Sequence, residues 1–306
     1  MSPAAGKKAL VTGAAGFIGS YLARYLVAEG WAVHLIVRPA SDLGILHEAR
    51  ERVVSHVHDG TTTGMQRIVE QARPDVVFHL ASLFLSQHRP EEVEPLVRSN
   101  ILFGTQLAEA MAGCGCGRLV NTGTSWQHFE NSLSSPVNLY AATKQAFEAV
   151  LQYYVEACSF SVITLKLFDT YGPRDPRPKL FTLLRKVAME SEPLAMSPGE
   201  QLIDLVYIDD VVAAFVLAAE RLLAGEAQGH EHYAVSSGAP LPLRDLVGLY
   251  GRIVGRELPI RWGERPYRPR EVMVPWNTGV SLPGWEPRVG LAEGLRRMVV
   301  TGGQLP

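Results

Sequence analysis

Short apolar runs alternate with longer amphipathic segments from the start of the chain to Gly172. Short runs rich in β-branched residues are typical of buried strands, whereas apolar residues spaced three or four apart indicate helices. The pattern predicts strands at 8–13, 32–38, 75–82, 118–125 and 161–172, and helices at 17–30, 92–113 and 139–158. Strands and helices in this alternation form a parallel sheet with right-handed crossovers. The predicted fold class is α/β, a Rossmann-type doubly wound parallel sheet with a smaller C-terminal lobe.

The pattern changes after Gly172, where the segment PRDPRPK is rich in proline and arginine and the regular alternation ends. We expect residues 1–172 to form the nucleotide-binding domain. Residues 173–200 and 236–306 are expected to form the smaller, substrate-binding lobe. Residues 201–235 contain another strand–helix pattern, LVYIDDVVAAFVLAAERLLAG, and are expected to return to the first domain.

Composition and charge narrow the class of protein. The 306 residues are 47% apolar with a formal net charge of −2, which suits a soluble enzyme with a sizeable core. Neither end carries a block of like charges, so no nucleic-acid surface is expected. No apolar run reaches the roughly 20 residues that span a bilayer, and no signal-peptide pattern precedes the first strand. Three cysteines argue against a disulfide framework, and GCGCG at 113–117 lacks a second pair of metal ligands. We expect a cytoplasmic protein without a metal site.

The segment VTGAAGFIGSYL places three glycines across the junction of the first predicted strand and helix. Gly13 permits the tight turn, Gly16 lets backbone N–H groups approach a pyrophosphate, and Gly19 lets the helix pack close to the sheet. The spacing G-x-x-G-x-x-G differs from the common G-x-G-x-x-G, but its position between strand and helix is the context such a motif requires. This junction is therefore predicted to bind a dinucleotide.

The end of the second predicted strand indicates which dinucleotide binds. An acidic residue there binds the adenosine ribose hydroxyls, whereas an arginine accommodates a 2′-phosphate. This strand ends in LIVRPAS, with Arg38 and no carboxylate beside it. Because a guanidinium presents a planar set of donors to a phosphate, NADP(H) is favoured over NAD(H). The alternative is a solvated arginine at a strand end.

Tyr140 and Lys144 lie one turn apart in the predicted helix LYAATKQAFE and share a face. A phenol has a pKa of about 10, and a nearby ammonium lowers it, so Tyr140 is a candidate proton donor to a developing alkoxide. The preceding strand end, LVNTGTSWQ, carries the hydroxyls of Thr122, Thr124 and Ser125. One of these is expected to hydrogen-bond a substrate carbonyl.

These motifs resemble the extended short-chain dehydrogenase/reductase family, which includes sugar-nucleotide epimerases, dehydratases and reductases. The resemblance spans nearly the whole chain, in TGAAGFIG, FHLAS, SNILFGTQLAEAM, YAATK, FDTYGPRD, LVYIDDVVAAFVLAAE and LPGWEPRVGLAEGLRRM. It implies that Tyr140 and Lys144 are catalytic and that Lys144 also holds the nicotinamide ribose. The cofactor contacts that it implies come from Gly13, Gly16, Phe17, Ile18, Gly19, Arg38, Asp59, Gly60, Leu80, Ala81, Asn100, Lys144 and Phe168.

The resemblance also implies a homodimer, in which relatives pair the helix around Asn100 and the helix after Tyr140 into an intersubunit four-helix bundle. Apolar residues beyond one core-facing stripe, including Leu151, Tyr154 and Val155, agree with this expectation. A homodimer is therefore predicted.

In this family the catalytic hydroxyl lies four residues before an aromatic residue. With Trp126 as that aromatic, Thr122 takes the catalytic place, and Thr124 becomes a flanking residue that contacts substrate. Related dehydratases carry Asp and Glu directly after the catalytic threonine, whereas this chain has Gly123 and Thr124, which cannot titrate. Related epimerases are usually NAD binders with an acidic second-strand end, and Arg38 argues against that. Hydride transfer is the reaction that remains.

The late segment GERPYRPREVMVPW concentrates Arg265, Arg268 and Arg270. The resemblance places Arg270 on the diphosphate of a sugar nucleotide, while the arginine expected before VDD is Ile203 here. The predicted substrate contacts are Thr124, Lys179, Leu180, Arg268 and Arg270.

Several stretches, among them VNTGTSWQ and NLYAATKQAFE, resemble reductases related to the CDP-abequose and CDP-paratose synthases. A 4-ketoreductase acting on a nucleotide-linked 4-keto-6-deoxyhexose is therefore predicted. Both dTDP and CDP sugars remain open. The alternatives are an epimerase of the same family and a non-catalytic NADP-sensing protein.

Overall fold

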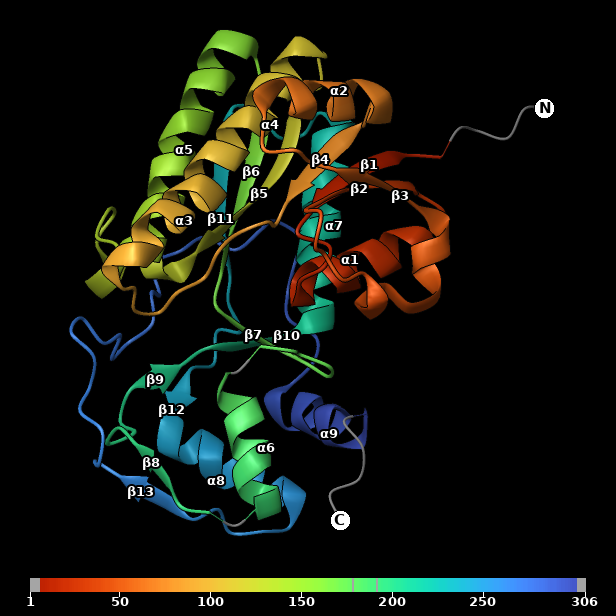
Figure 1. Ribbon diagram of the computed structural model, residues 1–306. Helices are drawn as coiled ribbons and strands as arrows, with labels where there is room; N and C mark the ends of the chain where they lie inside the picture. The colour runs from red at the N-terminus through yellow and green to blue at the C-terminus, as the bar shows by residue number, and fades with distance from the viewer. Residues whose placement is uncertain (1–5, 178, 191, 302–306) are drawn as a thin grey trace.

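A computed structural model describes residues 6–177, 179–190 and 192–301 of the chain. Within these residues a seven-stranded, fully parallel sheet has the strand order β11-β6-β5-β4-β1-β2-β3 (Figure 1). Its strands are β1 (Lys8–Thr12), β2 (Ala32–Val37), β3 (Val53–Val57), β4 (Val76–His79), β5 (Arg118–Thr124), β6 (Ser161–Leu167) and β11 (His230–Val235). The order reverses direction between β1 and β4, as in a doubly wound sheet, so the predicted fold class is confirmed.

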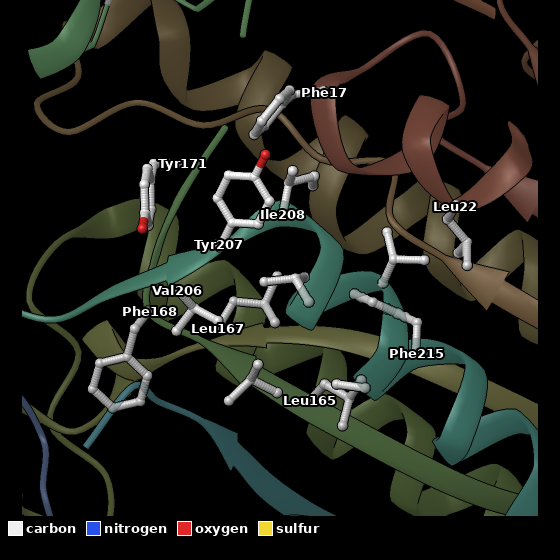
Figure 2. Close-up of a cluster of buried hydrophobic side chains, with 14 of the residues drawn as sticks. Phe17, Leu22, Leu165, Leu167, Phe168, Tyr171, Val206, Tyr207, Ile208 and Phe215 are labelled. Atoms are coloured by element: carbon white, nitrogen blue, oxygen red, sulfur yellow. The ribbon is translucent and has the colours of Figure 1, made fainter. Parts of the chain in front are cut away.

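Helices cover both faces of the sheet. They are α1 (Phe17–Ala28) and α7 (Ile208–Ala224) on one face, and α2 (Thr62–Ala72), α4 (Phe103–Gly113) and α5 (Leu139–Cys158) on the other. Successive strand residues point to opposite faces: Ala9 and Val11 pack in the core under α1 and α7, and Leu10 packs in the core under the other helices. Figure 2 shows part of the first core, where Phe215 of α7 lies near Leu165 of β6.

A second group of elements lies beyond the carboxyl ends of the sheet strands (Figure 1). They comprise three two-stranded sheets and three helices within the described residues. The pairs are β7 (Asp169–Tyr171) with β10 (Leu205–Tyr207), β8 (Leu194–Met196) with β13 (Ile260–Trp262), and β9 (Leu202–Ile203) with β12 (Leu241–Pro242). The helices are α6 (Leu180–Glu190), α8 (Leu243–Val254) and α9 (Leu291–Thr301).

The predicted helix 92–113 is interrupted. It consists of η2 (Pro90–Glu92), α3 (Val93–Val97), the π-helical turn η3 (Arg98–Leu102) and α4. Pro95 is accommodated in the first turn of α3, where its missing N–H is not needed. The π turn turns Asn100 inward, where its side chain is buried and hydrogen-bonded. Other short 3-10 segments are η1 (Gly44–Arg52), η4 (Ser125–Gln127) and η5 (Phe129–Asn131).

The residues cited as evidence for pairing of α5 between subunits lie elsewhere than expected. Leu151 and Tyr154 are buried in the protein's own core, because together with Phe147 they follow the i, i+4, i+7 spacing of the core-facing stripe of α5. The expectation that they lie beyond that stripe is therefore wrong. The exposed large apolar side chains of this face include Tyr153 on α5 and Val97 on α3.

Candidate active site

The glycine-rich turn between β1 and α1 has the geometry of a phosphate cradle. Gly13 has φ +78°, and a Cβ there would lie 2.7 Å from the backbone nitrogen of Ala81. Gly16 donates its N–H to the Gly13 carbonyl at 2.9 Å, and a Cβ on Gly19 would collide with that same carbonyl. The N-terminus of α1 has no side-chain cap, which leaves its N–H groups available to a phosphate. These residues fit the pyrophosphate of a nicotinamide dinucleotide.

A cavity of about 640 Å³ opens at the carboxyl edge of the sheet, with walls from the sheet and from the elements beyond it. Most residues predicted for the site line it. These are Gly13, Gly16, Phe17, Ile18, Gly19, Leu80, Thr122, Thr124, Tyr140, Lys144, Phe168, Lys179, Leu180 and Arg268. The predicted residues outside its lining are Arg38, Asp59, Gly60, Ala81, Asn100 and Arg270.

Arg38 follows the last residue of β2 and is exposed. Strand β2 pairs with β1 in a register that sets Ile36 beside Thr12, so Arg38 lies at the same edge as the glycine turn. Its backbone N–H donates to Ser41, and within the described part of the chain its guanidinium has no hydrogen bond or ion pair. The guanidinium is therefore free to bind an anion.

Asp59 and Gly60 lie between β3 and α2. The Asp59 carboxylate accepts hydrogen bonds from the backbone and the hydroxyl of Thr61, and the bond from the backbone N–H is the main cause that lowers the pKa of Asp59. The Gly60 carbonyl accepts a hydrogen bond from the Gln106 side chain. The two residues thus form an ordered turn at the sheet edge, beside the strand that precedes Arg38.

The loop after β4 is held from two sides. The Thr12 hydroxyl oxygen accepts the N–H groups of Leu80 at 3.1 Å and Ala81 at 3.0 Å. The Asn100 side chain accepts the N–H of Leu83 and donates to the Thr143 hydroxyl on α5 at 2.9 Å. Asn100 therefore connects this loop to the helix that carries Tyr140 and Lys144.

Helix α5 directs Tyr140 and Lys144 into the cavity. Its N-cap, Asn138, accepts the N–H of Ala141 at 2.9 Å and donates to the Ser86 carbonyl at 3.0 Å, which ties the start of the helix to the loop after β4. The helix therefore begins one residue before Tyr140.

Burial dominates the acid–base properties of this pair. It raises the pKa of Tyr140 to about 12, against the weaker effects of the Ser82 side chain and the Arg177 charge. Burial also lowers the pKa of Lys144 to about 8, and Glu148 opposes this shift. The expectation that Lys144 brings the Tyr140 pKa below its usual value is not met, because both groups are removed from water. Tyr140 is consequently protonated at neutral pH.

The three hydroxyls at the end of β5 differ in their hydrogen bonds. Thr122 donates its proton to the His79 carbonyl at 2.8 Å. Thr124 accepts the N–H of Trp126 at 3.3 Å, and its own proton is donated to no described residue. The Ser125 hydroxyl has no partner in the described ranges either. All three line the cavity, so Thr124 and Ser125 have a donor to spare, whereas the proton of Thr122 is already engaged.

Aromatic rings form the wall beside Tyr140. Phe84 meets Tyr140 edge-on at 4.9 Å between ring centroids and lies 5.7 Å from Trp126. Lys179 stands over the Phe84 ring at 4.7 Å, and Arg268 stands over the Trp126 ring at 5.5 Å. Phe84 did not emerge from sequence reasoning, and its only signal was its place just after FHLAS.

The two arginines predicted to contact substrate, Arg268 and Arg270, lie in different surroundings. Arg268 lines the cavity and pairs with Glu271 at 2.6 Å. Arg270 donates to the Ser135 hydroxyl at 2.8 Å and stands over the Phe129 ring, outside the cavity lining. Ile203, which replaces the expected arginine, does line the cavity. Arg177 also lines it, bound to Asp175 and stacked over Phe17, and was not predicted.

The described residues contain neither a membrane-spanning helix nor a cluster of metal ligands. None of their helices is both long and apolar enough to cross a membrane. No three side chains of the His, Cys, Asp or Glu type gather there in a metal-binding arrangement. Cys114 and Cys116 of the GCGCG segment are free thiols, and Cys116 donates to the Pro74 carbonyl at 3.2 Å.

The fold and the cavity define a nucleotide-binding enzyme of the short-chain dehydrogenase type. The family model described as the NAD dependent epimerase/dehydratase family matches residues 9–235, and the chain belongs to this family. It is 25% identical to a CDP-abequose synthase of Salmonella muenchen, over 96% of this chain and 97% of the relative. It is 29% identical to a UDP-glucose 4-epimerase of Mycolicibacterium smegmatis, over 95% and 97%.

Among solved structures, the chain is similar to a UDP-glucuronic acid 4-epimerase from Bacillus cereus in complex with UDP-glucuronic acid and NAD. The TM-score is 0.84 at 25% identity, and the match covers 96% of this chain and 98% of that one. Relatives that act on nucleotide sugars thus include both synthases and epimerases at comparable identity.

Proposed function

We propose that the protein is an NADPH-dependent 4-ketoreductase of a nucleotide-linked 4-keto-6-deoxyhexose. The observation that carries this proposal is one cavity in which the glycine cradle, Tyr140 and Lys144 meet a strand end without a carboxylate. Gly123 and Thr124 occupy that strand end, so a sugar held there meets proton donors but no acid–base pair for elimination. Reduction of a carbonyl needs only a hydride and one proton.

Tyr140 is the proposed proton donor. Its pKa of about 12 keeps the phenol protonated, as reduction requires. A strand-end hydroxyl is proposed to hydrogen-bond the carbonyl oxygen as negative charge develops on it. The four-residue spacing predicts Thr122 for this role, and the free donor proton supports Thr124. Lys144 is proposed to hold the nicotinamide ribose.

The proposed cofactor is NADP(H), which supplies the hydride when bound. The unpaired guanidinium of Arg38 at the end of β2 supports a 2′-phosphate contact, since a charged fork of donors binds such an anion well. Contacts of Asp59, Gly60, Ala81, Asn100 and Phe168 to the cofactor remain predictions.

The proposed substrate carries a diphosphate and a sugar. Lys179 and Arg268, both predicted substrate contacts, line the cavity and are proposed to bind the diphosphate. Arg268 is already paired with Glu271, and Arg270 would have to leave Ser135 to contribute. The similarity to a CDP-abequose synthase supports a deoxysugar nucleotide, and dTDP and CDP sugars are the two candidates. A cytoplasmic homodimer remains the expected state.

A 4-epimerase is the second candidate, because the 29% identity to a UDP-glucose 4-epimerase exceeds the 25% identity to the CDP-abequose synthase. An epimerase oxidises and re-reduces its substrate without net turnover of the dinucleotide. It would therefore be purified with tightly bound dinucleotide.

The test is to mix the purified protein with NADPH and either the CDP- or the dTDP-linked 4-keto-6-deoxyhexose, and to follow the NADPH absorbance. The proposal predicts stoichiometric NADPH loss with at least one of them, and an NMR spectrum of the product identifies the nucleotide and the C4 configuration. In a parallel incubation with UDP-glucose, its interconversion with the 4-epimer without NADPH loss would establish the epimerase. Binding of NADPH without either reaction would establish a sensor.

A further inference from the structure

A buried ion pair lies behind the strand end that carries the candidate hydroxyls. The ammonium of Lys166 on β6 contacts both carboxylate oxygens of Glu148 on α5, at 2.9 and 3.1 Å. Only 4% of the Lys166 side chain and 9% of the Glu148 side chain are exposed. Burying two charges is costly, and such a pair adds little net stability. Stability alone therefore does not explain why this ion pair is buried behind the strand end.

A glutamine connects this pair to the strand end. Gln127 is fully buried, and its side-chain N–H donates to Glu148 at 2.9 Å. Its side-chain oxygen accepts the backbone N–H of Thr124, also at 2.9 Å. A continuous path of hydrogen bonds thus runs from Lys166 through Glu148 and Gln127 to the backbone of Thr124.

Gly123 shows how closely the carboxylate approaches the strand. A Cβ on Gly123 would lie 2.9 Å from the Gln127 side-chain oxygen and 3.1 Å from a Glu148 oxygen. Any larger residue would displace these groups. The position at which related dehydratases carry an aspartate is therefore filled from behind by Glu148 and Gln127.

Lys144 stands one helical turn before Glu148, on the same side of α5, and 2% of it is exposed. Glu148 thus has one ammonium on its own helix and another on β6. The histidines around these charges are His79 of β4, His230 and His232 of β11, and His128 after η4, and the His232 ring lies 3.7 Å from the carboxylate. Burial lowers the pKa of all four histidines, so they are neutral at and above neutral pH.

We propose that Glu148 is a positioning residue: with Lys166 and Gln127 it holds the end of β5 in place, and its carboxylate is the buried counter-charge of Lys144. The inference rests on the proposed function in one respect, that Lys144 and the strand end act on the reactants. The ion pair and its link to the strand end follow from the contacts alone. Without Glu148, the buried Lys166 ammonium loses its carboxylate partner one helical turn from Lys144, and without Lys166 the carboxylate is no longer shared between two ammonium groups.

The two single variants should therefore change Lys144 in opposite directions. Glu148→Gln keeps the shape and the acceptor for Gln127 but removes the negative charge, which should lower the titration midpoint of Lys144 by roughly one pH unit. Lys166→Met should raise that midpoint by a similar amount, and the double variant should lie close to the wild type. Glu156→Gln, at an exposed position two turns further along the same helix, is the matched control and should have no effect.

The measurement is competitive acetylation of the unliganded protein over a neutral to alkaline pH range, with the modified Lys144 peptide quantified by mass spectrometry. Opposite shifts support the proposal. Shifts of the same sign, or none beyond the control, overturn it, because a merely structural role predicts no sign reversal. If one single variant does not fold, the other still has a predicted direction, and a shift in the opposite direction or none overturns the proposal. The double variant, which lacks the buried Lys166–Glu148 pair, then serves as the reference.

Positioning of the strand end has its own readout. Gln127→Leu leaves both charges in place but removes the acceptor of the Thr124 N–H, so kcat should fall at least tenfold while the Lys144 midpoint stays unchanged. An unchanged kcat overturns the positioning role. Acetylation of Lys144 needs no substrate, so its result stays interpretable if the protein is not a reductase. Equally, a failed acetylation prediction would leave the reductase assignment unaffected.

Discussion

Replacing each strand-end threonine by valine tests which hydroxyl serves the substrate carbonyl. Valine keeps the branched shape of threonine and suits a strand, so the main change is the loss of the hydroxyl. The Thr124 hydroxyl lines the cavity, and no described residue accepts its proton. Loss of one donor to a developing oxyanion reduces kcat by roughly 100- to 1000-fold. We expect Thr124→Val to lose kcat by a factor in this range, with the affinity for NADPH nearly unchanged.

Thr122→Val should behave differently. Its proton is donated to the His79 carbonyl at 2.8 Å, so binding a substrate would require that bond to be given up. Such a bond contributes about 1 kcal/mol, which corresponds to a factor of roughly five. Any increase in kcat from a bond between Thr122 and the substrate would be reduced by that factor. We expect Thr122→Val to reduce kcat less than about tenfold, and to lower the free energy of unfolding by about 1 kcal/mol because a buried carbonyl loses its partner.

The assay combines kcat from NADPH oxidation at saturating substrate with the free energy of unfolding in urea. Thr105→Val is a matched control, because the Thr105 hydroxyl donates to the Ile101 carbonyl at 2.9 Å on a helix that does not line the cavity. That variant should lose stability without losing kcat. A hundredfold loss of kcat in Thr122→Val, with little loss of kcat in Thr124→Val, would contradict this prediction. Thr122 would then be the catalytic hydroxyl, as the four-residue spacing from Trp126 predicts.

Three further predictions follow from individual residues. Arg38→Asp should shift the preference from NADPH toward NADH, and equal ratios of kcat/KM for the two cofactors before and after the change would contradict the contact. Lys144→Met should abolish turnover yet raise the free energy of unfolding at pH 7 by up to about 3 kcal/mol, since burial moves the lysine pKa from 10.5 to about 8. The folded state then binds fewer protons than the unfolded state between these values, so wild-type stability should rise from about pH 8 to about pH 10.5, and urea titrations of the variant should lack that rise. Gly19→Ala should weaken dinucleotide binding at least tenfold in a fluorescence titration, because its methyl group would meet the Gly13 carbonyl.

The chemistry of short segments could be predicted from the sequence. The glycine turn depends on residues within one strand–helix junction, and the backbone positions of Gly13 and Gly19 leave room for no other residue. Tyr140 and Lys144 share a face because helical periodicity requires it, wherever the helix lies. The parallel sheet followed from the alternation of elements. Each of these conclusions needs only neighbours a few residues away.

Contacts between distant segments could not be predicted from such local patterns. Arg268 and Arg270 are two residues apart, yet one stands over Trp126 inside the cavity and the other over Phe129 outside it. No periodicity separates them, because they lie on an irregular loop that meets rings more than a hundred residues earlier in the chain. The same holds for Phe84, whose role depends on its distance from Tyr140.

Thus the sequence alone determined the fold class, the glycine cradle and the Tyr140–Lys144 pair, since local propensity and spacing suffice for each. Only the tertiary structure decided how the hydroxyl of Thr122 is engaged and that Glu148 meets Lys166 behind Gly123. It also reversed the expected effect on the pKa of Tyr140, because burial outweighs the influence of a neighbouring charge. Burial and hydrogen-bond partners are properties of the packed molecule, and a linear pattern does not contain them.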